Sequence, residues 1–336
     1  MDRSDPGDIR VAAYNLGGFI DNDSGFTDTG PGFIRSTVFT PPNARVVQAI
    51  GADVWAFQEI DDLSAAQVAD ALNRAVPLED GNTWFAHRNA GQVIASRFPI
   101  ASSVTNVPGD PREPAIATVD LPDERFTRDL HVLNLHLKAR SGSSNEARRL
   151  ASVDELLDYL ADTRDSTSSR ALPEETPIVV LGDYNTASGT APVLNLANGR
   201  YADPQRTELA QPDWDGTSLA VVDARHNVTG QDTYTFRNGS SRSRLDWHAY
   251  TDSVMSLSRA FVLNTVLMSN TDRAAAGLES QDVVFDRDTS RWDHLPVVAD
   301  YRLTAFVIPE PTSGALLVIT VGLTLNRPRI RGTHGA

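Results

Sequence analysis

The stretch that decides the fold is Pro177-Ile178-Val179-Val180-Leu181-Gly182-Asp183-Tyr184-Asn185. Its first five residues form a continuous apolar run, which is typical of a strand buried on both faces at the centre of a sheet. Side chains two residues apart lie on the same side of an extended backbone, so Asp183 and Asn185 can reach one phosphate, one water or one metal ion. The alternative is an Asx turn, in which the two side chains satisfy only their own backbone.

The next apolar run towards the N-terminus, from Leu130 to Leu137, contains a histidine at its end. A neutral imidazole at His136 can give a proton to a leaving oxygen or accept one from water near pH 7. The alternative is a histidine satisfied within the core of an apolar strand. No partner for this imidazole is evident in the sequence.

An acidic residue lies in the segment Arg244-Leu245-Asp246-Trp247, on the C-terminal side of the central stretch. Asp246 could form a structural ion pair with Arg242 or Arg244. It could equally orient a histidine, as carboxylates do in hydrolases that use a carboxylate and imidazole pair.

The adjacent pair Asp293-His294 precedes Leu295-Pro296-Val297-Val298, so it lies at the entrance of a strand, where a proline is tolerated. Neighbouring side chains on an extended backbone point to opposite faces. We therefore expect different roles, with the carboxylate on a metal ion and the imidazole on substrate or water.

Two further oxygen ligands lie near the N-terminus, Asn15 at the end of the strand pattern 9–16 and Glu59 at the end of 53–59. Magnesium uses one or two carboxylates together with water. The alternatives are a turn former for Asn15 and a capping or solvent-facing residue for Glu59. Burying a polar group at the end of a strand costs several kcal/mol of desolvation free energy unless the group is paired. In a metal-assisted phosphate-ester hydrolase, the metal ion and the phosphate provide that pairing.

Composition limits the class of protein. A chain of 336 residues with 40% hydrophobic residues can bury one large core. Its strand patterns outnumber its short helical patterns, which predicts an α+β domain of two β-sheets packed face to face with helices outside.

Charge and cysteine content exclude several functions. A formal net charge of -14 argues against a passive, sequence-independent nucleic-acid coat, but a nuclease with a bound divalent cation remains compatible with it. The absence of cysteine excludes disulfides, thiolate chemistry and cysteine-bound zinc.

These segments, in this order, resemble the endonuclease/exonuclease/phosphatase superfamily, whose fold is shared by pancreatic-type deoxyribonucleases, apurinic endonucleases, inositol polyphosphate phosphatases and bacterial sphingomyelinases. The resemblance covers 9–303 and implies a four-layered α/β sandwich, with two packed mixed β-sheets flanked by helices, as a catalytic domain over 9–304. It rests on seven blocks: Tyr14-Asn15, Gln58-Glu59, 93–100, Asn134-Leu135-His136, Gly182-Asp183-Tyr184-Asn185, Arg244-Leu245-Asp246 and Asp293-His294-Leu295-Pro296-Val297.

The resemblance also implies roles for individual residues. Asn15, Glu59 and Asp293 would bind Mg²⁺, or Mn²⁺ or Ca²⁺. His294 would be the general base, oriented by Asp246.

The remaining site residues would act on the substrate. Asp183 and Asn185 would position nucleophile and phosphate, and His136 would hydrogen-bond the phosphate or assist the leaving group. Arg112 resembles a phosphate-contacting arginine, and its alternative is a surface arginine in a proline-rich turn.

The segment 305–336 resembles a PEP-CTERM sorting signal, with Pro309-Glu310-Pro311, an apolar run over 314–325 and a cluster of arginines. This resemblance implies export, anchoring at the cell envelope and processing by an exosortase-type enzyme. The apolar run is shorter than the roughly 20 residues of a membrane-spanning helix, and residues 1–8 show no signal peptide. The alternative is a disordered tail with a chance apolar patch.

The sequence therefore predicts a monomeric, divalent-metal-dependent phosphodiesterase, most simply a nuclease that hydrolyses DNA or RNA by in-line attack of an activated water. The alternative substrate is an inositol phosphate or a sphingomyelin-type phosphate ester. A third possibility is a non-catalytic envelope binding module. That possibility predicts decay of the catalytic set, whereas both histidines and every acidic candidate are present.

Overall fold

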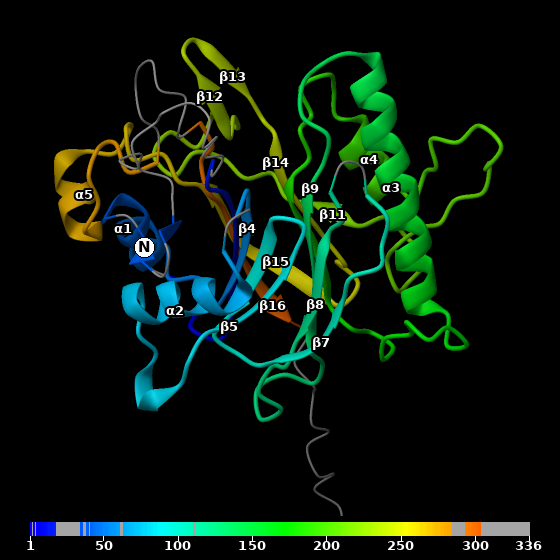
Figure 1. The fold of residues 1–336 in the computed structure, drawn as a ribbon, viewed down its shortest axis with the longest axis horizontal. Coiled ribbons are helices and arrows are strands. Elements are labelled where there is room, and N and C mark those ends of the chain that lie inside the picture. The colour runs from blue at the N-terminus through cyan, green and yellow to red at the C-terminus, as the bar shows by residue number, and fades with distance from the viewer. Residues whose placement is uncertain are drawn as a thin grey trace, which may run out of the picture. The chain divides into compact units, whose positions relative to one another are not determined.

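Two six-stranded β-sheets organise the residues that the computed structural model describes, which are 1, 3, 5–17, 34–35, 38–39, 41–60, 63–109, 112–283 and 293–303 (Figure 1). In the first sheet the strand order is β15 (Met255–Val262), β16 (Val297–Leu303), β1 (Ile9–Asn15), β4 (Val54–Gln58), β6 (Gln92–Ser96) and β5 (Phe85–Asn89). In the second it is β11 (Ala220–Val221), β14 (Asp246–Tyr250), β10 (Ile178–Asp183), β9 (Leu130–His136), β8 (Ala115–Val119) and β7 (Ile100–Val104).

Both sheets are mixed. Strand β1 runs parallel to β4, strand β9 runs parallel to β10, and the other pairs are antiparallel. Two short hairpins accompany the sheets, β2 (Ile34–Arg35) with β3 (Val38–Phe39), and β12 (Phe236–Asn238) with β13 (Ser241–Ser243). The predicted architecture of two packed mixed sheets is confirmed.

Helices cover the outer faces of the sheets (Figure 1). Helices α1 (Pro41–Ile50) and α2 (Ala65–Ala75) pack on the first sheet, and α3 (Ser143–Arg164) and α4 (Ala191–Ala197) pack on the second. A short α5 (Asn270–Ala276) and a 3-10 turn (Glu79–Gly81) complete the described helices. None of these helices is both long and apolar enough to cross a membrane.

Local sequence explains where these helices start. Ser64 caps α2 through its side chain, and Gln67 returns a bond to the backbone of Ser64, which completes a capping box. Helix α1 begins at Pro41, because the fixed φ of proline suits a first helical turn. Helix α4 has only seven residues, too few to show a clear helical period in the sequence.

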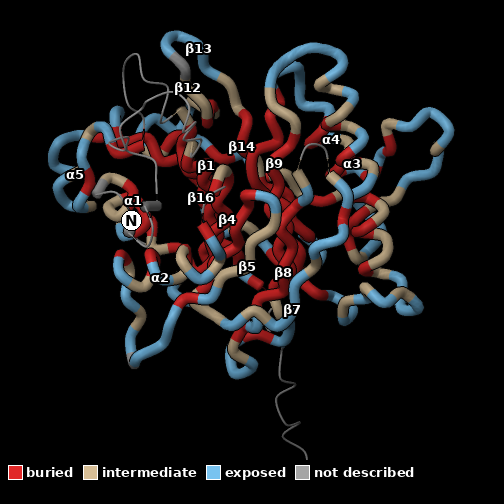
Figure 2. Tube along the Cα trace, viewed as in Figure 1, coloured by how far each residue is buried: buried red, intermediate tan, exposed pale blue. Residues whose placement is uncertain are grey.

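The central strand β10 separates two hydrophobic clusters, as its continuous apolar run predicts. Val179 and Leu181 face the core between the sheets, whereas Ile178 and Val180 face the core beneath α3 and α4. Buried residues concentrate along both sheets (Figure 2).

Gly182 follows this strand run and is required by its backbone. Its φ is +128°, and a Cβ atom there would lie 2.2 Å from the carbonyl oxygen of Leu135 on β9. A side chain at this position would collide with the neighbouring strand, so the glycine allows β9 and β10 to stay paired up to Asp183.

A buried polar bridge joins the two sheets. The Asn134 side chain on β9 accepts a hydrogen bond from Gln58 Nε2 at 2.6 Å and donates to the carbonyl oxygens of Phe57, at 2.8 Å, and Val93, at 3.0 Å. Asn134 and Gln58 are both fully buried. Because Glu59 follows Gln58 and His136 lies two residues after Asn134, this bridge fixes the distance between those two candidate site residues.

The predicted sorting tail, 305–336, lies outside the described residues. The export, processing and monomer predictions therefore remain predictions.

Candidate active site

The candidate site lies where strand ends from both sheets meet. Strands β1 and β4 run parallel and end together, with Asn15 opposite Gln58 and Glu59 next in the chain. On the second sheet, Asp183 lies opposite His136 on one side and opposite Asp246 on the other. The topology therefore brings together residues that are far apart in the sequence.

An amide and two carboxylates link the two sheets at this edge. Asn15 Nδ2 lies 3.1 Å from Glu59 Oε1 and 3.2 Å from Asp183 Oδ2. Glu59 has a positive φ of 62°, a conformation that non-glycine residues seldom adopt and that is common at functional sites. The turn after β4 thus places the Glu59 carboxylate beside Asn15.

His294 and Asp246 form a hydrogen-bonded pair. His294 Nδ1 lies 2.8 Å from Asp246 Oδ2, and its Nε2 lies 3.7 Å from Asp183 Oδ2 and 4.0 Å from Asp293 Oδ1. Burial alone would lower the pKa of His294, but the carboxylates of Asp246 and Asp183 outweigh burial and hold it well above its ordinary value. In the metal-free protein the imidazole therefore holds a proton more tightly than an ordinary histidine does.

A threonine that the sequence analysis missed holds this pair in place. The Thr235 hydroxyl accepts hydrogen bonds from the backbone N–H groups of Leu245 and Asp246, both at 2.9 Å. Its carbonyl oxygen accepts from the N–H of Leu295 at 2.7 Å. One buried residue therefore contacts the segments of both members of the pair.

The hairpin that follows Thr235 adds two contacts to the same segment. The Phe236 ring packs edge-on against the His294 imidazole at 5.2 Å between centroids. The N–H of Arg237 donates to the carbonyl oxygen of Asp293 at 2.7 Å. Strand β12 thus fixes the backbone of Asp293 and the ring plane of His294.

His136 is buried beside two carboxylates. Its Nε2 lies 3.6 Å from Glu59 Oε1 and 3.7 Å from Asp183 Oδ2, and its Nδ1 has no hydrogen-bond partner among the described residues. Burial, with smaller contributions from Arg112 and His294, holds the pKa of His136 well below its ordinary value. The imidazole is neutral at pH 7, and Glu59 is the acidic neighbour that the sequence did not reveal.

Arg112 is half-buried, and its charge contributes to the low pKa of His136. This influence requires the guanidinium to lie in the neighbourhood of the cluster. Its predicted contact with phosphate stays a prediction.

Asp183 and Asn185 form the Asx turn that the sequence offered as the alternative, with the N–H of Asn185 donating to Asp183 Oδ1 at 2.8 Å. Asn185 Nδ2 also donates to the Leu137 carbonyl oxygen at 3.0 Å. The turn leaves Asp183 Oδ2 directed towards Asn15 and both histidines. The structural and the functional interpretations are therefore compatible.

The carboxylates of the site are short of positive charge. Burial raises the pKa of Asp183 to about 7, although His294 opposes this effect, and burial likewise raises the pKa of Asp293. Asp246 Oδ1 is buried without a hydrogen-bond partner among the described residues. A hard divalent cation matches such a group of oxygen donors.

Two sets of residues could hold such an ion. Ligand atoms of Asp183, Asp246 and His294 lie within 4.8 Å of one another. In that set, however, His294 Nδ1 and Asp246 Oδ2 already bond to each other. In the predicted set of Asn15, Glu59 and Asp293, Asn15 Nδ2 and Glu59 Oε1 likewise lie 3.1 Å apart, and this ligand assignment stays a prediction.

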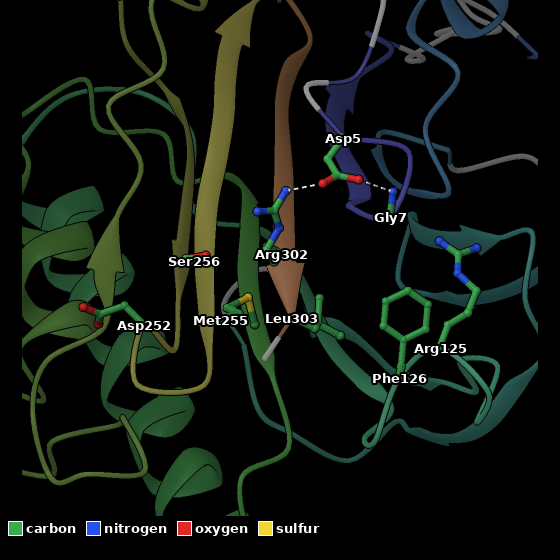
Figure 3. Close-up of a pocket in the computed structure, with 9 residues that line it drawn as sticks. All are labelled: Asp5, Gly7, Arg125, Phe126, Asp252, Met255, Ser256, Arg302 and Leu303. Carbon is green, nitrogen blue, oxygen red and sulfur yellow. Dashed lines mark hydrogen bonds and ion pairs between the residues drawn. The ribbon is translucent and has the colours of Figure 1, made fainter. Parts of the chain in front are cut away.

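A separate cavity of about 500 Å³ lies at the other end of the first sheet (Figure 3). Met255, the first residue of β15, and Leu303, the last residue of β16, line it together with Phe126 and Arg302. None of the predicted site residues lines this cavity.

A model of the Endonuclease/Exonuclease/phosphatase family matches residues 12–267. Among solved structures, ANGEL2, a 2′,3′-cyclic phosphatase, in complex with adenosine-2′,3′-vanadate shares 16% identity with a TM-score of 0.53, over 88% of this chain and 96% of that one. This likeness shows the fold.

Two other structures are similar over nearly the same extent. An endonuclease/exonuclease/phosphatase from Beutenbergia cavernae shares 20% identity with a TM-score of 0.49, over 88% of this chain and 72% of that one. The human Nocturnin catalytic domain with bound sulfate shares 16% identity with a TM-score of 0.49, over 89% and 95%. No curated protein matches the sequence.

Proposed function

This chain belongs to the endonuclease/exonuclease/phosphatase family, and we propose that it is a divalent-metal-dependent phosphodiesterase that hydrolyses DNA or RNA by in-line attack of an activated water. The observation that supports this most is the His294–Asp246 pair at 2.8 Å, with the free Nε2 of the imidazole directed towards a buried cluster of carboxylates. A proton acceptor and a cation site side by side are what phosphate-ester hydrolysis requires.

Asn15, Glu59 and Asp293 would hold the metal ion. Bound there, it would neutralise charge on the phosphate and lower the pKa of a water molecule. Side chains of the protein carry out the proton transfer and the binding of the phosphate.

His294 acts as the general base. Its Nε2 accepts the proton of the attacking water, while Asp246 holds Nδ1 and stabilises the imidazolium that forms. The carboxylates that raise the pKa of His294 make it a stronger base, and a cation bound beside them would oppose that rise and favour the neutral ring that accepts a proton.

His136 and Arg112 act on the phosphate. Because burial keeps His136 neutral, the imidazole can offer an N–H to a phosphate oxygen or to the leaving group without bringing a charge of its own. Arg112 contributes positive charge beside it. Asp183 and Asn185 orient the water and the phosphate between the two histidines.

For 305–336 we keep the proposal of an exported, envelope-anchored protein that an exosortase-type enzyme processes. It rests on sequence alone. Mass spectrometry of the protein recovered from membrane and extracellular fractions tests it, since cleavage near Pro309-Glu310-Pro311 would give a product shortened at that position.

The experiment that tests the catalytic proposal compares plasmid DNA, RNA, sphingomyelin and an inositol polyphosphate as substrates for the full chain, with Mg²⁺ and with EDTA. We expect metal-dependent cleavage of nucleic acid, and none by the His294→Ala variant. Release of phosphate or phosphocholine from the other two substrates alone would show that the substrate assignment is wrong. No hydrolysis of any of the four would contradict the enzyme proposal.

A further inference from the structure

Two arginines lie directly opposite each other on the β12–β13 hairpin. The register pairs Arg237 with Arg242 across the two strands. Like charges at directly opposed positions destabilise a β-ribbon. The hairpin therefore carries two positive charges at directly opposed positions, with the Arg237 guanidinium directed towards Gly239 and the Arg242 guanidinium over Tyr234, and an anion between them would draw both groups together.

No carboxylate of the described residues relieves this repulsion. Arg237 Nε donates to the Gly239 carbonyl oxygen at 3.3 Å, and the Arg242 guanidinium lies 4.9 Å from the Tyr234 ring centroid. Neither forms an ion pair within the described part of the chain. The third arginine here, Arg244, is occupied, because it packs on Trp247 at 3.7 Å and pairs with Asp223 at 3.4 Å.

The surrounding sequence is locally basic in an acidic protein. Residues 234–245 contain three arginines and no aspartate or glutamate, although the chain has a net charge of -14. Residues 137–145, between β9 and the first turns of α3, contain Lys138 and Arg140 and again no acidic residue. Both segments adjoin the strand ends that form the candidate site (Figure 1).

The arginine pair is close to the site but separated from its reacting centre. The Arg237 N–H bonds the Asp293 carbonyl oxygen, so the hairpin backbone is joined to the site directly. Side chains alternate along a strand, so the face with Phe236, whose ring contacts His294, is opposite to the face with the arginine pair. An anion bound by the pair is therefore not the phosphate under attack.

We propose that Arg237 and Arg242 together bind a phosphate of a polynucleotide substrate next to the one that is cleaved. Two guanidinium groups can share one phosphate through charge-assisted hydrogen bonds, and the phosphate removes their mutual repulsion. A polynucleotide repeats its phosphates along a chain, so one can lie outside the site while another reacts. A single headgroup phosphate has no second group to offer. This inference deepens the proposed function and rests on it.

The test measures binding and turnover separately. Fluorescence anisotropy of a labelled single-stranded oligonucleotide, in EDTA, gives the Kd of the full chain and of the double variant Arg237→Gln/Arg242→Gln. The control is Arg125→Gln/Arg128→Gln, which removes the same charge, with Arg125 lining the distant cavity of Figure 3. Thermal unfolding shows whether each variant is folded.

We expect the hairpin variant to raise the Kd about tenfold. The slope of log Kd against log salt concentration should fall by about 0.7 for each phosphate that the arginines no longer neutralise, whereas the control changes little. With metal, the ratio of kcat/KM for the oligonucleotide to kcat/KM for bis(4-nitrophenyl) phosphate should fall by a similar factor.

Equal loss of binding in the hairpin and control variants, or no loss in either, would overturn the proposal. A weaker effect on the oligonucleotide than on an inositol polyphosphate would overturn it too, because the second phosphate would then belong to a small substrate. Failure of the proposed function alone would give a different result. The wild-type chain would still bind the oligonucleotide in EDTA through the two arginines, but it would hydrolyse no diester with metal.

Discussion

The two ends of strand β1 both bury charged or strongly polar side chains, and they treat them differently. Near its start, the fully buried Arg10 bonds both oxygens of Asp300, at 2.6 and 2.8 Å, and donates to the carbonyl oxygens of Met1 and Ile50, each at 2.8 Å. At its end, Asn15 lies against Glu59 and Asp183, in a cluster where the pKa of Asp183 is raised to about 7.

The Arg10–Asp300 pair therefore stabilises the fold, whereas the carboxylates around Asn15 are arranged for the proposed chemistry. At the Arg10 end the opposite charges are matched and well bonded. At the Asn15 end negative charge exceeds positive charge, and buried atoms such as His136 Nδ1 and Asp246 Oδ1 lack partners among the described residues. Under the proposed function, these atoms would serve a cation and a phosphate, at a cost in the stability of the empty protein.

The largest expected effect is on turnover at the Asn15 end. His294→Ala removes the base, and we expect kcat to fall by about 10³-fold, within the range for loss of general base catalysis. The melting temperature should fall as well, because Asp246 loses its buried partner, so kcat is compared at a temperature at which thermal unfolding shows the variant to be folded. Wild-type turnover of the variant would show that the assigned mechanism is wrong.

At the Arg10 end the expected effect is on stability instead. Asp300→Ala removes the buried carboxylate that bonds the Arg10 guanidinium twice, and we expect a loss of about 3–5 kcal/mol in the free energy of unfolding, measured with urea. The matched control is Asp5→Ala, which breaks the exposed Arg302–Asp5 ion pair of 2.6 Å in the same part of the fold and should cost less than about 1 kcal/mol. Similar losses in the two variants would remove the basis of the comparison.

Neutralising an acidic side chain at the Asn15 end should increase the free energy of unfolding, whereas Asp300→Ala decreases it. Because burial raises the pKa of Asp183 to about 7 from its ordinary 3.8, the folded metal-free protein is destabilised as pH rises from about 4 to 7. We expect Asp183→Asn in EDTA to raise the free energy of unfolding at pH 7 by about 1–2 kcal/mol and to abolish turnover with metal. The gain in stability should vanish near pH 4, where both proteins hold a neutral group. A variant that is less stable than wild type at pH 7 would contradict this account.

The smallest effect that we predict concerns Thr235, which positions the catalytic pair without touching substrate. Thr235→Val keeps the shape and removes the hydroxyl that the N–H groups of Leu245 and Asp246 use. We expect kcat to fall about tenfold while KM stays within about twofold, because the loss corresponds to about one hydrogen bond to the frame of the base. Thr235→Ser should restore kcat. A fall in KM and kcat together, or no rescue by serine, would assign the residue a purely structural role.

Much of the fold follows from local pattern. The continuous apolar run 177–181 predicts a central strand because both of its faces meet a hydrophobic core. The resemblance to a known family predicts which polar residues share the site. The strand registers place Asp183 opposite His136 on one side and opposite Asp246 on the other.

What the sequence does not reveal depends on long-range contacts. The Gln58–Asn134 bridge joins residues 76 positions apart, and Thr235 contacts both Leu245 and Leu295. Neither contact leaves a periodic signal in the chain. Strand β15 is missed because its exposed middle residues hide the alternation of a buried strand.

The position of β16 has a consequence for synthesis. This strand is the last one described, yet it lies inside the first sheet, between β15 and β1, and Asp293 and His294 come immediately before it. A chain still emerging from the ribosome has made β1 long before the partner that covers it, and Asp293 and His294 are made only just before that partner. Pairing of the two distant strands is a slow, late event in folding. The candidate site therefore assembles only after synthesis has reached β16.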